Sequence, residues 1–204
     1  MDKVSKRWKK ALAVSVLVST TGFGSSVALS AGSQNVASAA RQYQSWDHKD
    51  WRSYAGVDEK GNYKCVAMTG GDGDNSLKLH ASVGGGVYIQ FSEAAARGYP
   101  TSLNENDEVA FVVRGEQTIT FDETSVTTGH TYEGIPFAHA GTPDGYVPEM
   151  VQQFRAGSTL EVMIKDPVRN TWSDLGKFSL SGFTANFLKI STWCGFDPSF
   201  SSRS

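Results

Sequence analysis

Residues 77–91 read LKLHASVGGGVYIQF, and this stretch carries the strongest fold signal in the chain. On either side of the glycines, apolar side chains alternate with polar ones, a period of two that is typical of a β-strand with one buried face. Gly84-Gly85-Gly86 separates the two halves, and glycine permits the positive φ angles of a tight turn. The stretch therefore predicts an antiparallel hairpin of two strands, Leu77–Ser82 and Val87–Phe91.

Short runs of the same kind recur along the chain, separated by clusters of Gly, Asn and Asp. They predict further strands at Asp50–Ala55, Tyr63–Met68, Glu108–Val113, Gln117–Phe121 and Thr159–Lys165. Helices are expected only late in the chain, at Pro148–Gly157 and Gly182–Ile190, where apolar residues share one helical face. We therefore expect a mainly β fold, a single antiparallel β-sandwich-like domain with one or two short helices near its C-terminal end.

The first 39 residues have the pattern of a secretory signal peptide followed by a small-residue leader. Five basic residues lie within positions 1–10, a short apolar run follows at Ala11–Val18, and candidate cleavage sites end at Ala28 and Ala39. The run is shorter than the roughly 20 apolar residues of a transmembrane helix, although an uncleaved N-terminal anchor is the alternative. We expect export to the periplasm, the outer envelope or the medium. A single β-rich domain would then span residues 40–204, opening on a polar lead-in at 40–50 and with no membrane span.

The net charge of −2 combines a basic leader with an acidic remainder. The leader holds five of the 19 Lys and Arg and one of the 21 Asp and Glu, so residues 40–204 carry 14 basic against 20 acidic side chains, about −6. Proteins that bind nucleic acid present a basic surface to the phosphates, so this balance disfavours a nucleic-acid partner. It also disfavours electrostatic attachment to anionic lipid.

Cys65 and Cys194 are the only two cysteines of the chain. In an oxidising compartment an even pair is expected to form a disulfide, which here would enclose most of the domain. A redox-active pair is the alternative, but the C-x-x-C spacing typical of that chemistry is absent.

Several of these features occur in an order that resembles the invasion-associated locus B family of exported bacterial proteins. The features are the exported start, Trp51 in an early strand, Cys-Val-Ala-Met at Cys65–Met68, FRAGS at 154–158 and SLSGFTA at 179–185. The resemblance implies a β-sandwich-like domain and a role in attachment to, or entry into, host cells, and it carries no catalytic residue set. The family often has extra cysteines near the middle of the domain, and this chain does not.

Residues 124–147 are rich in Thr, Gly, Pro and His with weak periodicity, and we expect a long loop there. Long ordered loops are often functional, and aromatic side chains are frequent at interfaces. The predicted contact residues are His130, Tyr132, Phe137, His139 and Tyr146. We accordingly expect a non-enzymatic envelope protein without cofactor or metal, whose partner is an envelope or host-surface protein.

The same loop offers an alternative. His130, Glu133 and His139 are residue types that bind zinc, which would make the protein a periplasmic hydrolase or another metal-dependent enzyme. Their spacing matches no short metal-binding signature.

Overall fold

The computed structural model describes residues 43–58, 60–70, 75–84, 86–95, 100–116 and 118–200. Two antiparallel sheets pack together, and two short helices lie near the C-terminal end, so the predicted mainly β, sandwich-like fold is confirmed. The expected leader at 1–39 lies outside the described residues, as does Gln117 at the start of one predicted strand.

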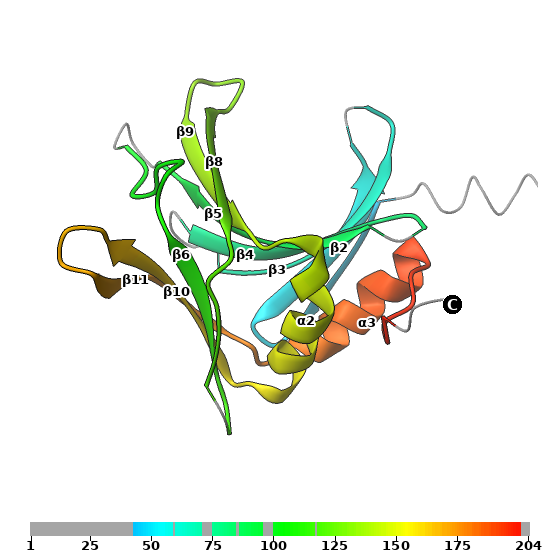
Figure 1. The fold of residues 1–204 in the computed structure, drawn as a ribbon. Coiled ribbons are helices and arrows are strands. Elements are labelled where there is room, and N and C mark those ends of the chain that lie inside the picture. Colours follow the sequence, from blue (N-terminus) through cyan, green and yellow to red (C-terminus); the bar gives the residue numbers. More distant parts are fainter. Residues whose placement is uncertain are drawn as a thin grey trace, which may run out of the picture.

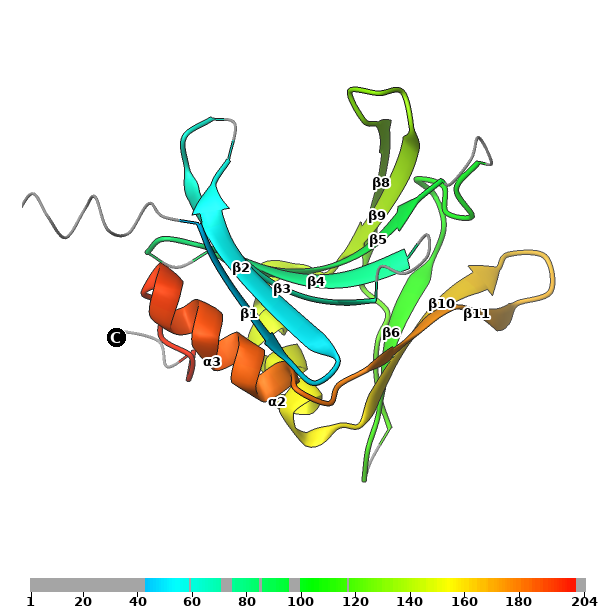
Figure 2. The same cartoon turned by 180° about the vertical axis from the view of Figure 1, so that it is seen from behind.

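Seven strands form the larger sheet, in the order β1-β2-β3-β4-β5-β9-β8. Their bounds are β1 Gln44–His48, β2 Trp51–Val57, β3 Tyr63–Gly70, β4 Asn75–Ser82, β5 Val87–Ala94, β8 Ser125–His130 and β9 Pro136–Gly141. The sheet is strongly curved, so that β1–β2 and β8–β9 rise on either side of a concave face (Figure 1). No described helix or strand lies over this face (Figures 1 and 2).

The convex side of the larger sheet is covered by the rest of the domain. The smaller sheet has the order β11-β10-β6-β7, with β6 Val109–Arg114, β7 Ile119–Phe121, β10 Thr159–Asp166 and β11 Thr171–Ser179. It shares this side with helices α2, Val147–Ala156, and α3, Phe183–Cys194, as Figure 2 shows from behind. A short 3₁₀ turn, η2 at Asp144–Tyr146, leads into α2.

The hydrophobic core fills the space between the convex face and these covering elements. Trp51 of β2 and Phe91 of β5 are fully buried there, and their rings contact Phe183 of α3 and Phe178 of β11 at centroid distances of 5.0 and 6.0 Å. Gly182 has φ +98°, and a side chain at this position would collide with the carbonyl oxygen of His48. Gly182 therefore turns the chain with a positive φ that other residues rarely adopt, and the next residue, Phe183, is fully buried in the core.

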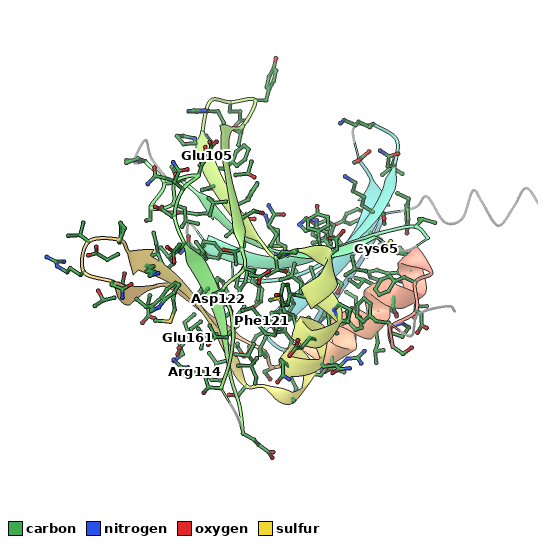
Figure 3. All side chains as sticks on the ribbon, in the orientation of Figure 1. Cys65, Glu105, Arg114, Phe121, Asp122 and Glu161 are labelled. Atoms are coloured by element: carbon green, nitrogen blue, oxygen red, sulfur yellow. A yellow bond between two sulfur atoms is a disulfide. The ribbon has the colours of Figure 1, made fainter. Side chains whose placement is uncertain are left out.

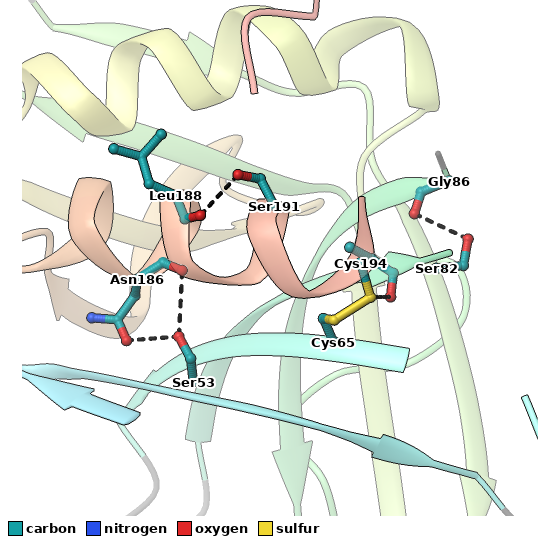
Figure 4. The surroundings of a disulfide bond; sticks show 9 residues. Ser53, Cys65, Ser82, Gly86, Asn186, Leu188, Ser191 and Cys194 are labelled. Carbon is teal, nitrogen blue, oxygen red and sulfur yellow. Dashed lines mark hydrogen bonds between the residues drawn. A yellow bond between two sulfur atoms is a disulfide. The ribbon is translucent and has the colours of Figure 1, made fainter. Parts of the chain in front are cut away.

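The disulfide between Cys65 and Cys194 is formed, as predicted (Figure 4). It joins β3 to the last residue of α3 across a Cα–Cα distance of 6.1 Å. Beside it, the hydroxyl of Ser53 donates a hydrogen bond of 2.7 Å to Oδ1 of Asn186, so helix and sheet are also joined by a buried polar contact. The disulfide and this hydrogen bond thus fasten α3 to strands β3 and β2 on the convex side.

Three stretches differ from the sequence-based expectation. The polar lead-in at 40–50 contains β1, which pairs with β2 although few of its side chains are apolar. The loop expected at 124–147 is instead the hairpin β8–β9 followed by η2. The expectation was wrong because the buried residues of the hairpin strands, Ala138 and Ala140, are too small to give a clear apolar period. Strand β11 extends from Thr171, and most of its side chains are exposed, so its pattern carries no sign of a buried face.

Candidate functional site

The alternation that builds the core also determines what the concave face presents. In β3, β4 and β5 the residues Cys65, Leu79 and Ile89 point into the core. Their sequence neighbours point the other way and form cross-strand rows, of which the first runs Tyr54–Val66–His80–Tyr88 and the second Met68–Lys78–Gln90. The concave face therefore carries aromatic rings, a lysine and a histidine.

Three tyrosines form the wall of a cavity of about 490 Å³ at one end of this face, which we call the tyrosine cavity. It is lined by Tyr43, Tyr54, Gly56, Val57, Asp58, Lys64, Val66, His80 and Tyr88. The rings of His80 and Tyr88 stack with centroids 4.5 Å apart. Burial and the nearby charge of Lys78 lower the pKa of His80 to about 4. The imidazole is thus neutral near pH 7.

A second cavity of about 460 Å³ lies farther along the same face, and we call it the Lys78 cavity. Lys78 of β4, Ser92 of β5 and His139 of β9 line it from three neighbouring strands, together with Met68, Asn75, Ser76, Glu93, Ala94, Thr131 and Phe137. Burial lowers the pKa of Lys78 and that of His139, because both side chains lose part of their hydration.

Several polar groups of these cavities have no partner. Nε2 of His80, Oγ of Ser92 and Nδ1 of His139 are buried without a hydrogen bond to any described residue. The ammonium of Lys78 likewise forms no ion pair or hydrogen bond within the part of the chain that the structure describes. Buried polar groups in proteins are normally hydrogen-bonded, so these atoms make the two cavities the candidate functional site.

The two cavities adjoin along the strands. Val66 and His80 line the tyrosine cavity, while Met68 and Lys78, two residues further along the same face of β3 and β4, line the Lys78 cavity. A two-residue step along a strand is about 6.6 Å. A smaller cavity of about 330 Å³ next to α2 shares Lys64, His80 and Tyr88 with the tyrosine cavity. We call the tyrosine cavity and the Lys78 cavity together the concave cleft.

The five predicted contact residues do not form one surface. His130 ends β8, and Tyr132 is fully exposed in the turn that joins β8 to β9. Phe137 and His139 lie on β9, stack with centroids 4.6 Å apart and line the Lys78 cavity. Tyr146 packs in the opposite direction, against Phe121 at 6.4 Å, and Figure 3 places Phe121 near α2. Two of the five residues therefore belong to the concave cleft.

The alternative metal site is not assembled. Within the described ranges, no group of three or more His, Cys, Asp or Glu side chains is placed to hold a metal ion, and His130, Glu133 and His139 all lie within those ranges. The hairpin separates them, since His130 and His139 project from different strands.

Most residues of the cleft were missed by the sequence analysis. Tyr54, Val66, Lys78, Tyr88 and Ser92 lie in strands that were, for the most part, predicted correctly. The alternation did place these residues on the face opposite the core, because each lies next to a buried side chain of its strand. Residues on that face are normally assigned to solvent. What could not be read from the sequence is the curvature of the sheet, which makes the face a cleft.

Models of protein families, curated protein sequences and solved structures were each compared with this chain, and none of the three comparisons gave a match. The resemblance to the invasion-associated locus B family stays a prediction. In the described part of the chain, no helix has the length and apolar character needed to cross a membrane.

Proposed function

We propose that this protein is an exported, non-enzymatic binding protein of the bacterial envelope, and that the concave cleft is its binding site. One observation carries the proposal. A sheet face over which no described helix or strand lies carries tyrosine rings, a partly buried lysine and unpartnered buried polar atoms. A merely solvated face would instead carry exposed charged and hydroxyl side chains.

The dimensions of the cleft agree with this role. Ligand sites in proteins typically enclose about 300–1,000 Å³, with apolar and aromatic walls and a few placed polar groups. The tyrosine cavity and the Lys78 cavity, at about 490 and 460 Å³, both lie in this range.

Export is supported by the disulfide, which is a feature of oxidising compartments, and by the leader pattern of residues 1–39. We place the mature protein in the periplasm or at the outer envelope. If the resemblance to the invasion-associated locus B family holds, the protein also contacts a host or envelope protein, and the exposed Tyr132 is the candidate contact. N-terminal sequencing of protein recovered from the periplasm tests export, and an intact leader on that protein would contradict it.

A neutral aromatic probe tests the binding site. We expect cinnamyl alcohol to shift the backbone amide NMR signals of Val66, His80 and Tyr88 in a saturable titration. Tyr88→Ala should weaken binding, because it removes one wall of the tyrosine cavity. Tyr132→Ala is the matched control, since it removes an equal ring from the exposed turn. Shifts confined to the convex side, or no saturation, would contradict the proposal.

A further inference from the structure

We propose that the concave cleft selects a small amphipathic organic anion, whose carboxylate lies beside Lys78 and whose apolar body lies in the tyrosine cavity. This inference rests on the proposed function, because it names the ligand class of the same cleft.

The charge of the Lys78 cavity favours an anion. Lys78 is partly buried and has no anionic partner among the described residues. An ammonium held partly out of water gains more from an opposite charge than an exposed one does. The lowered pKa of Lys78 agrees with a group that has lost hydration and received no counter-charge.

The two described acidic residues that line these cavities, Asp58 and Glu93, are already engaged. Asp58, at the rim of the tyrosine cavity, pairs with Lys64 at 2.9 Å. Glu93, which lines the Lys78 cavity, accepts hydrogen bonds of 2.8 and 3.3 Å from the backbone amides of Ser102 and Leu103. The amides carry no charge, but they hold both carboxylate oxygens of Glu93, and Lys78 is left without an ion pair among the described residues that line the cleft.

Ser92 and His139 provide hydrogen bonds next to the ammonium. Ser92 lies directly opposite His139 in the pairing of β5 with β9, and it is a diagonal neighbour of Lys78 across β4 and β5. The unpartnered Ser92 hydroxyl can donate to a carboxylate oxygen, and Nδ1 of His139 can do so in the tautomer that places the proton there. A carboxylate has about four acceptor positions, so it can use both donors together with the lysine.

The adjoining tyrosine cavity defines the rest of the ligand. Tyr54, Tyr88 and Val66 present flat and apolar surfaces, and burial raises the pKa of both tyrosines, so these phenols stay neutral. A ligand with its carboxylate at Lys78 therefore places an aromatic or aliphatic body against uncharged walls. A carboxylate without such a body would leave this cavity unused.

Titration calorimetry at pH 7 tests the inference with three probes: cinnamate, cinnamyl alcohol and acetate. In the wild-type protein we expect cinnamate to bind about tenfold more tightly than cinnamyl alcohol, the factor of one charge-assisted hydrogen bond. Acetate should show no measurable binding. Lys78→Gln should weaken cinnamate about tenfold and leave the alcohol unchanged. Ser92→Ala should also weaken cinnamate alone, and it serves as the second variant if Lys78→Gln does not fold.

Lys177→Gln is the matched control, because it removes the same charge from an exposed residue of β11 on the smaller sheet, and it should change neither affinity. Equal binding of cinnamate and cinnamyl alcohol would overturn the anion preference while leaving the binding site in place. A preference for cinnamate that survives in Lys78→Gln would also overturn it, and acetate binding as tightly as cinnamate would overturn the role of the apolar body. If neither aromatic probe binds, the proposed function itself fails.

Discussion

Removing the disulfide should cost more stability than any other small change to the domain. The change is the double substitution Cys65→Ala and Cys194→Ala. Both positions are buried, with exposed fractions of 0% and 1%, and alanine leaves no unpaired polar atom there. The two residues are 129 apart in sequence, so the bond restricts a long loop of the unfolded chain. The chain-entropy relation gives about 5 kcal/mol for a loop of this length.

This loss should be measured as a free energy of unfolding in urea, with and without reductant. We expect the variant to unfold about 5 kcal/mol more easily than the oxidised wild type, with a fall of about 10–20 °C in melting temperature. The fold should persist at low temperature, because α3 still buries Phe183, Phe187 and Ile190 on the convex side. Reductant should lower the stability of the wild type to the level of the variant and leave the variant unchanged.

Two results would contradict this prediction. A variant within about 1 kcal/mol of the oxidised wild type would show that the disulfide hardly restricts the unfolded chain. If α3 separates alone while the sheets stay folded, the bond acts as a local fastening, and amide exchange would show early loss of protection confined to Phe183–Cys194.

Three further predictions concern single positions. His80 has a pKa of about 4 in the folded protein and 6.5 in the unfolded chain, so between these pH values the unfolded chain binds the proton more readily. The free energy of unfolding should therefore fall by up to about 3 kcal/mol from about pH 6.5 to about pH 4. In urea titrations His80→Gln should make this pH dependence weaker. A Cβ at Gly129 would lie 2.6 Å from Cζ of Phe137, so Gly129→Ala should cost about 1–3 kcal/mol in thermal unfolding, whereas Gly145→Ala, with nothing within 4 Å, should be neutral. Metal analysis of the purified protein should find no stoichiometric zinc, and one zinc per chain that is lost in His139→Ala would favour the metal-dependent enzyme instead.

The strands that could be predicted are those whose alternation matches burial. Leu77, Leu79, Ile89 and Phe91 are apolar and buried, so the central hairpin was clear from its sequence. Strand β8 was missed, because Val126 is its only apolar residue and its position depends on pairing with β9 at the edge of the sheet. The backbone hydrogen bonds that hold β8 to β9 form with almost any side chains, so they produce no periodic pattern in the sequence.

The disulfide could be predicted from composition and compartment, whereas the cleft could not. Its residues lie far apart in sequence, from Tyr43 to His139, and only the order of the strands brings them onto one face. His139 and Phe137 were predicted as contact residues because of their residue types, and both line the cleft for a different reason, their register opposite β5.

The separation of the two faces of the larger sheet has a consequence for how such a protein can diverge. Substitutions at Leu79 or Ile89 disturb the packing of the whole domain, because these side chains lie in the core. Substitutions at Val66 or Tyr88 change the cleft and leave the core packing intact. Selection can therefore exchange one ligand for another on this scaffold by altering residues on one face of five strands, without searching for a new fold.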